Sequence, residues 1–494
     1  MSKKFSETRE IRKLILCPQF VDIILAKEVA VKKKKDFVHP YIPNSVPAVK
    51  EKMLAEIGVK SISELYEDIP KNLRLKKALS LPEPKLSELE LKRHVQMILN
   101  RNTSCEEFTS FLGGGCAHHY VPAICDEVTR RSEFLTAYAG EPYEDAGRFQ
   151  VLFEYESLMA ELLDFDVVNV PTYDWGQAAS TAVRMAGRIT KRKRVLVADT
   201  VSPDRLAVMK NYCHPVMDLI PVDHDSETGL LDTADLASKL TPATAAVYFE
   251  NPSYLGFIET QGQKVADLAH AKGALLIVGV DPISLGVLKP PSQYGADIAC
   301  GDIQGLGNHM YFGGALGGFI ASRDEEKFVL EYPSRLFGIA TTSVEGEWGF
   351  GDVAYSRTSF DKREKGKEFV GTAAALHGIG AAVYLSLLGP QGMRDLGRHI
   401  LQKTQYAIKK LAAIRRVRIR FRSAPFKEFV LDFTRTGKSV AKINRRLLRH
   451  GIFGGKDLTG EFPELGGCAL YCITEMITKA DIDNLAAALK DYLR

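Results

Sequence analysis

The 494-residue sequence predicts an α/β protein with a mostly parallel sheet, followed by a small C-terminal α+β domain. Three short apolar runs rich in β-branched residues, at 194–198, 245–250 and 274–280, predict buried strands. Segments with helical spacing separate these runs, and this alternation is typical of a doubly wound sheet. The last third of the sequence instead mixes long helical patterns with a half-exposed strand pattern, which indicates a separate small domain.

The N-terminal region, residues 1–104, predicts an arm followed by short helices. Its first 37 residues include the basic run 32–35, and three prolines then mark an extended linker. Helical patterns follow at 46–57, 61–66 and 87–99. We expect the basic arm to be solvated and to pack on a neighbour, an interpretation favoured over contact with nucleic acid or an anionic membrane.

Residues 105–372 predict the large α/β domain. Helical patterns at 177–189 and 261–271 lie between the strand runs, and Gly273 is placed to end the second helix. The run 317–322 adds another strand.

Residues 373–494 predict the C-terminal α+β domain. A long helical pattern covers 373–413 and is interrupted at Gly389-Pro390. Residues 416–422 alternate strictly between apolar residues and arginines, which predicts a half-exposed antiparallel strand. The remaining predicted elements are strands at 429–433 and 469–474 and helices at 440–449 and 479–493.

Composition excludes several classes of protein. Hydrophobic residues make up 45% and charged residues 26%, so the chain can bury a large core. The formal net charge of +4 is too small to indicate nucleic-acid binding by itself. No apolar run reaches 18 residues and no secretory signal is present, so we expect a cytoplasmic protein without membrane contact. The eight cysteines are irregularly spread, which favours reduced intracellular thiols over a disulfide framework.

The chemistry of a cofactor site is suggested by Asp281, which directly follows the predicted strand 274–280. In pyridoxal-phosphate (PLP) enzymes of the aspartate aminotransferase type, an aspartate in this place pairs with the pyridinium nitrogen, and a lysine further along forms the Schiff base. The corresponding loop here, residues 301–314, contains no lysine, and Lys289 lies too close to Asp281. Since an amine is indispensable for that bond, the sequence predicts a PLP-enzyme fold without its own PLP.

The expected phosphate-binding turn also departs from what PLP requires. This turn would be residues 173–177, at the start of a helix where small residues normally let backbone N–H groups approach a phosphate. Trp175 is bulky and Asp174 would repel a phosphate, whereas Asp174 suits a helix N-cap. We therefore expect side chains to fill the pocket.

Long segments of the chain resemble one family. They occur in the same order as in that family and cover about residues 38–494; the most telling are 111–115 (FLGGG), 119–122 (HYVP), 132–138 (SEFLTAY), 281–291 (DPISLGVLKPP), 294–298 (YGADI) and 382–390 (AVYLSLLGP). The family is the glycine cleavage system P-protein, and the resemblance is to its subunit 1, the N-terminal-half subunit of glycine dehydrogenase (decarboxylating).

This resemblance implies a fold, a reaction and partners. The fold is PLP-dependent transferase-like (aspartate aminotransferase fold type I) with a seven-stranded type of sheet. The implied partner is a homologous subunit 2 (beta) that carries the lysine and PLP, in an alpha2beta2 heterotetramer. Together the subunits decarboxylate glycine and pass the aminomethyl group to the lipoylated H-protein, while this chain helps to wall the active site and binds no PLP covalently.

Three segments depart from the family pattern. Residues 139–147 are one residue shorter than usual, residues 368–373 lack two asparagines, and the loop 301–315 is altered. Because these segments are expected to face the shared cleft, the chain resembles a divergent paralogue. Two alternatives therefore stay open: a paralogous subunit of a PLP decarboxylase complex acting on another amino acid, and a regulatory or scaffold pseudoenzyme.

Six residues are candidates for the site. By resemblance, Tyr138, His119 and Tyr120 are expected to line the partner's active site. Three others, Asp281, His309 and Thr372, are interpreted as vestiges of a cofactor site, with His309 and Asn308 hydrogen-bonded inside the vacant pocket. No spacing of histidines and cysteines resembles a zinc signature, so no metal is expected.

Overall fold

The structure is a computed structural model that describes residues 38–39, 41–77, 79–135, 142–368, 370 and 374–493. Within these residues the chain forms two compact units, the first ending at Leu99 and the second beginning at Asn100. The predicted N-terminal arm up to residue 37 lies outside the described residues.

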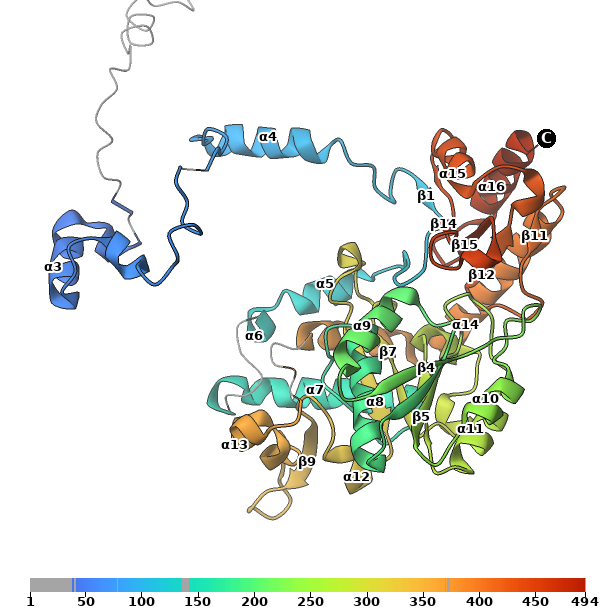
Figure 1. Cartoon of the computed structure of the whole chain (residues 1–494), viewed down its shortest axis with the longest axis horizontal. Helices are drawn as coiled ribbons and strands as arrows, with labels where there is room; N and C mark the ends of the chain where they lie inside the picture. The colour runs from blue at the N-terminus through green and yellow to red at the C-terminus, as the bar shows by residue number, and fades with distance from the viewer. Residues whose placement is uncertain are drawn as a thin grey trace, which may run out of the picture. The chain divides into compact units, whose positions relative to one another are not determined.

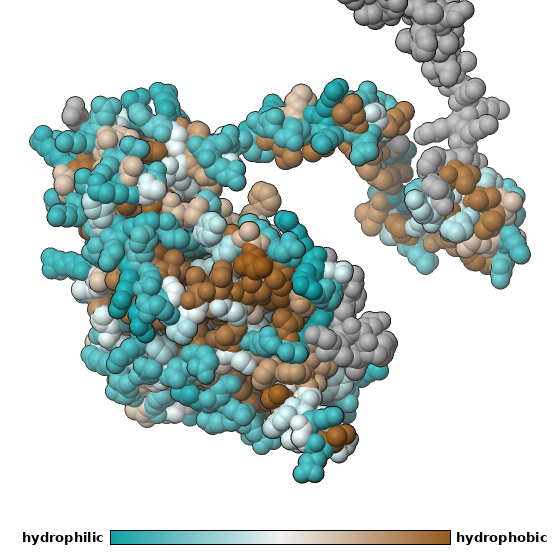
Figure 2. Space-filling model, turned by 180° about the vertical axis from the view of Figure 1, so that it is seen from behind, coloured by the Kyte–Doolittle hydropathy of each residue, from teal (hydrophilic) through white to brown (hydrophobic). Residues whose placement is uncertain are grey.

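The first unit contains the helices α3 (Pro47–Ile57) and α4 (Glu88–Leu99), with a 3₁₀ helix, Ile62–Tyr66, between them. Helix α3 ends at Gly58, whose φ of +85° suits a glycine better than any residue with a Cβ. None of the described residues of this unit is buried. Large apolar side chains, such as that of Leu86, are instead exposed. Figure 2 shows hydrophobic side chains, in brown, at the surface of this unit.

The second unit is built around a seven-stranded sheet in the order β2-β8-β7-β6-β5-β3-β4. Strands β3 to β7 pair in parallel, whereas β8 runs antiparallel to both of its neighbours. The sheet confirms the predicted mostly parallel α/β fold. Its strands are β2 (Val167–Val168), β3 (Arg194–Ala198), β4 (Asp218–Val222), β5 (Thr244–Glu250), β6 (Leu275–Gly279), β7 (Ile298–Asp302) and β8 (Gly318–Ser322).

Helices cover this sheet (Figure 1). Helix α8 (Trp175–Thr190) packs against β5 to β8 through an apolar face, and the Asp174 side chain caps it by accepting a hydrogen bond from the Gln177 N–H. The other helices of this region are α5 (Ala123–Thr129), α6 (Ser132–Leu135), α7 (Pro142–Leu163), α9 (Pro203–Cys213), α10 (Thr233–Lys239), α11 (Gly262–His270), α12 (Glu326–Val329) and α13 (Ser359–Lys362). A hairpin of β9 (Phe337–Thr341) and β10 (Trp348–Asp352) packs beside α7.

A four-stranded antiparallel sheet forms the C-terminal part of this unit, in the order β11-β12-β15-β14. The long helix α14 (Ala375–Ala412) leads into it and is interrupted at Gly389, which has φ +59°, as its Gly-Pro step predicts. The remaining elements are β11 (Arg418–Ile419), β12 (Glu428–Asp432), β14 (Lys456–Asp457), β15 (Cys468–Cys472), α15 (Val440–Leu448) and α16 (Lys479–Tyr492). Strand β1 (Thr109–Ser110) pairs separately with β13 (Ile452–Phe453).

The strand predicted at 416–422 is shorter in the structure. The alternation is present, since Val417 and Phe421 are buried, but only Arg418 and Ile419 form β11. The chain then leaves the sheet because the N–H of Arg422 donates to the carbonyl of Glu227 instead of to β12. None of the helices formed by the described residues is both long enough and apolar enough to cross a membrane.

Candidate functional site

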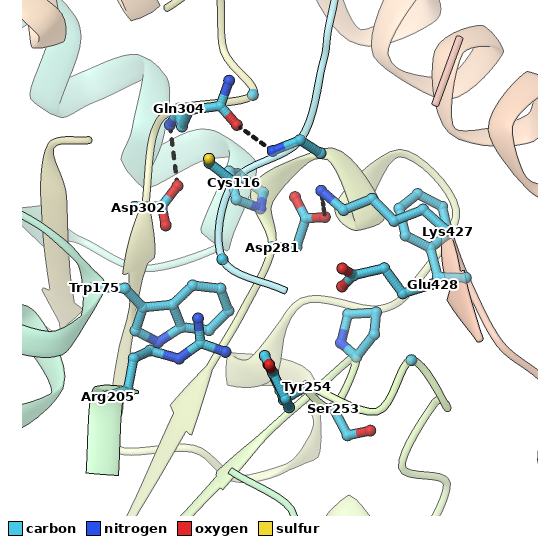
Figure 3. Close-up of a pocket in the computed structure, with 17 residues that line it drawn as sticks. Cys116, Trp175, Arg205, Ser253, Tyr254, Asp281, Asp302, Gln304, Lys427 and Glu428 are labelled. Atoms are coloured by element: carbon cyan, nitrogen blue, oxygen red, sulfur yellow. Dashed lines mark hydrogen bonds and ion pairs between the residues drawn. The ribbon is translucent and has the colours of Figure 1, made fainter. Parts of the chain in front are cut away.

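A pocket lies at the carboxyl ends of the parallel strands, where α/β folds place ligand groups (Figure 3). Asp281 follows β6 and Asp302 ends β7, while the first residue of α8, Trp175, forms another wall. The C-terminal part of the unit closes the pocket with Lys427 and Glu428, at the start of β12. The Trp175 side chain lines the pocket as expected, but side chains fill only part of it.

Lys427 reaches across the pocket to Asp281. Its Nζ lies 2.7 Å from Asp281 Oδ2, and both side chains are largely buried, at 16% and 14% exposed. The other carboxylate oxygen of Asp281 accepts a hydrogen bond from the Ile283 N–H at 3.1 Å. Burial alone would lower the pKa of Lys427, but the nearby carboxylate of Asp281 raises it, which keeps the amine protonated.

His119 joins this ion pair to Glu475. The ring Nε2 lies 3.3 Å from Lys427 Nζ, and the ring Nδ1 lies 2.9 Å from Glu475 Oε2. Because an ammonium group can only donate, Nε2 accepts and Nδ1–H donates to the carboxylate. Burial would raise the pKa of Glu475, but the hydrogen bonds from His119 and from the Tyr120 N–H lower it to about 2.

A second ionic cluster stands on the side of the expected phosphate turn. Arg205 on α9 forms two hydrogen bonds of 2.7 Å with Glu250, the last residue of β5. The guanidinium carbon lies 4.1 Å from the centre of the Trp175 ring, and the indole N–H donates to the Tyr248 hydroxyl at 3.2 Å. The cation that could have bound a phosphate is therefore already paired with a carboxylate.

Two further carboxyl groups face the pocket. Burial raises the pKa of Asp302 to about 7, and Asp281 adds to this effect. Burial also raises the pKa of Glu428, although its Oε1 accepts a hydrogen bond from the Gly114 N–H at 2.6 Å. Figure 3 shows the Glu428 carboxylate pointing into the pocket.

The residues of this pocket do not fit covalently held PLP. Asp281, which would meet a pyridinium nitrogen, is ion-paired with Lys427, and Arg205 is occupied by Glu250. The loop that should supply the lysine instead presents Gln304, whose carbonyl accepts from the Ala117 N–H and whose amide donates to the Asn308 carbonyl. The pocket thus offers neither a free amine in that loop nor an unpaired partner for the cofactor ring.

The structure brings some of the predicted site residues together and separates others. His119 and Asp281 belong to the same network, through Lys427. Tyr120 is 58% exposed, and only its backbone N–H takes part, by donating to Glu475. Tyr138 and Thr372 lie outside the described residues.

His309 and Asn308 do not lie inside the pocket, which corrects the expectation from the sequence. The His309 ring is half-exposed and pairs with Asp126 on α5 at 3.0 Å. The loop after β7 lines the pocket with Gln304 and Gly305 and has left the pocket by His309. Asn308 is buried and donates to the carbonyls of Ile303 and His377.

Sequence reasoning missed Lys427, Arg205 and Glu428. Each lies next to or within an ordinary helix or strand pattern, and none belongs to a recognisable motif. The only available signal was indirect: a carboxylate expected at a buried strand end requires a cation from elsewhere in the fold. Among the described residues, no group of three or more histidines, cysteines or acidic residues is placed to hold a metal ion.

Comparison with known proteins agrees with this architecture. A family model described as glycine cleavage system P-protein matches residues 39–489. The chain is 40% identical over 464 residues to a probable glycine dehydrogenase (decarboxylating) subunit 1 of Staphylothermus marinus, covering 92% of this chain and 98% of the relative.

Solved structures show the same relationship. The crystal structure of glycine decarboxylase (P-protein) of the glycine cleavage system, in inhibitor-bound form, is similar with a TM-score of 0.79 and 33% identity, covering 92% of this chain and 99% of that one. A sphingosine-1-phosphate lyase of Burkholderia pseudomallei has a similar fold, with a TM-score of 0.61 at 13% identity over 84% of this chain and 92% of its own. The fold is thus PLP-transferase-like, and by the extent of these matches the chain belongs to the glycine cleavage system P-protein family.

Proposed function

We propose that this chain is subunit 1 of a two-subunit glycine dehydrogenase (decarboxylating), an oxidoreductase of the glycine cleavage system. The observation that carries this proposal is the 40% identity to a relative of that name across 92% of the chain. Such continuous similarity favours glycine over another amino acid, despite the altered segments at 139–147 and 368–373. The aminomethyl group left after decarboxylation would pass to the lipoylated H-protein.

The subunit that carries PLP is, in this proposal, the partner. Support comes from the pocket of this chain, where Asp281 is paired with Lys427 and the loop after β7 contains no lysine. A homologous subunit 2 would supply the lysine, and this chain would contribute walls of the shared cleft. We further propose an alpha2beta2 heterotetramer, and the exposed apolar side chains of the first unit are consistent with contacts to other subunits.

Borohydride reduction of the assembled complex tests both parts of this proposal. The reduced complex is digested, and the pyridoxyl-lysine peptide is located by mass spectrometry while glycine decarboxylation is assayed in parallel with a panel of other amino acids. We expect the label on subunit 2 alone and turnover of glycine. A pyridoxyl group on any lysine of this chain would overturn the cofactor assignment, and turnover of another amino acid but not of glycine would overturn the substrate.

Of the three residues expected to line the partner's active site, Tyr138 and Tyr120 are proposed to reach it. His119 is buried with both ring nitrogens engaged, and it would act by positioning Glu475, which accepts from the Tyr120 N–H. Removing the Tyr138 hydroxyl should lose one hydrogen bond, about 1 kcal/mol, which corresponds to roughly a fivefold lower turnover. Tyr138→Phe is therefore measured in the assembled complex by steady-state kinetics and by gel filtration. Normal assembly with reduced turnover is expected, whereas unchanged kinetics with every accepted amino acid would refute the role of Tyr138.

A further inference from the structure

The Lys427–Asp281 ion pair connects two different sheets. Asp281 follows β6 of the seven-stranded sheet, and Lys427 precedes β12 of the C-terminal sheet. Figure 3 shows the lysine side chain extending over the pocket to the aspartate. The pair therefore lies at the boundary between the seven-stranded sheet and the C-terminal sheet, and not within one layer of the core.

The same boundary is closed by backbone contacts close to Lys427. A Cβ on Gly256 would lie 2.0 Å from the Glu428 carbonyl oxygen, so the chain after β5 and the start of β12 approach more closely than any side chain permits. The Phe426 N–H donates to the Gly256 carbonyl at 3.2 Å, and the Gly114 N–H donates to the Glu428 carboxylate at 2.6 Å. Lys427 thus stands where the C-terminal sheet is joined to the rest of the unit.

A buried carboxylate such as Asp281 is costly unless a cation or hydrogen-bond donors compensate it. In a PLP enzyme the pyridinium N–H of the cofactor does so. Here the compensating groups belong to the chain itself, the Ile283 N–H and the Lys427 ammonium. His119 and Glu475 then fix the lysine from the other side, so its position does not depend on a ligand.

We propose that Lys427 takes the structural place of the cofactor in this chain: its ammonium group compensates Asp281 and holds the C-terminal sheet closed against the seven-stranded sheet. We call the ion pair of Lys427 with Asp281 the latch, and it keeps the pocket in its closed form without a ligand. The latch concerns the stability of the cofactor-free chain and the closure of its pocket. It can therefore be refuted while the proposed enzymatic function stands, and the enzymatic function can be refuted while the latch stands.

A double-mutant cycle on the full chain tests the latch, with Lys427→Met, Asp281→Asn and the double variant. Removing one partner of a buried pair should lower the folded-to-unfolded ratio by roughly 100-fold or more in urea unfolding, because the other group stays buried and uncompensated. The double variant should lose much less than the product of the two single losses. Lys239→Met is the matched control, since Lys239 pairs with Asp235 of its own helix α10 and with Asp223, which follows β4, and neither partner belongs to the C-terminal sheet.

Hydrogen exchange distinguishes a latch from an ion pair that only adds stability. In Lys427→Met, under conditions where the variant is folded, the Gly114 and Phe426 amides should exchange roughly tenfold faster, while those of β5 and β6 keep their protection. Additive single losses, or exchange unchanged at those two amides, would overturn the proposal. If Lys427→Met does not fold, Lys427→Arg and the double variant decide: the proposal requires both to fold, and an insoluble double variant overturns it.

Discussion

Replacing Asp302 with asparagine should change how the stability of the protein depends on pH. Burial at the end of β7 raises the pKa of this carboxyl from 3.8 to about 7, so the folded protein holds a proton that the unfolded chain releases. The sign of the linkage follows: this contribution to stability is fully present below pH 3.8 and is lost as the pH rises through about 7. The full difference corresponds to about 4 kcal/mol. About 3 kcal/mol of it falls between pH 5 and pH 8, because the unfolded carboxyl is already ionised at pH 5.

The assay is urea unfolding of wild-type protein and Asp302→Asn at pH 5 and at pH 8. Because asparagine does not ionise, the variant should gain about 3 kcal/mol relative to wild type on going from pH 5 to pH 8. Asp324→Asn is the matched control, since Asp324 is exposed, and it should keep the wild-type pH dependence. Parallel pH profiles of wild type and Asp302→Asn would refute the assignment of a buried, protonated carboxyl to this position.

Three other predictions concern acid stability, a buried ion pair and the N-terminal arm. Glu475→Gln should remove an acid-sensitive contribution to the free energy of unfolding. The lowered pKa of Glu475 stabilises the fold above pH 4.5, and this stabilisation is lost as the pH falls towards 2. The stability of the variant, measured by acid unfolding, should therefore change less with pH in this range than that of the wild type. Glu250→Gln should reduce the free energy of unfolding by about 3 kcal/mol, because it leaves Arg205 buried without its counter-ion; an unchanged urea midpoint would contradict this. Deleting residues 2–36 should leave the melting temperature of the complex within a few degrees, because the arm precedes a proline-punctuated linker, and insoluble protein would argue against it.

The sequence predicted those parts of the fold in which burial leaves a local signature. Strands β3, β5 and β6 are buried along almost their whole length, so they appear as continuous apolar runs. Strand β4 was not predicted, because it lies at the sheet edge, is partly exposed and contains Pro221. The Asp174 N-cap was predicted correctly, since capping depends on neighbours within one turn.

The site was less predictable because its contacts join distant segments. Asp281 could be placed from its position after a strand, and the absence of a lysine in 301–314 was visible in the sequence. The partner of Asp281 comes instead from the start of β12, and nothing near Lys427 indicates where its side chain extends. His309 shows the converse error: its position in the sequence suggested the pocket, but the path of the loop carries it to Asp126.

A pocket whose charges are compensated within the chain is expected to affect stability, whereas a pocket that binds a cofactor affects turnover directly. Asp281, Lys427, Arg205 and Glu250 are each paired within the chain, and in the proposed complex these pairs would be made equally before and after a substrate binds at the partner's site. Interactions that are equal in the ground state and the transition state cannot accelerate a reaction. Changes inside this pocket should therefore act on folding and closure. Direct effects on turnover should come instead from exposed groups such as Tyr120, whose side chain does not line this pocket.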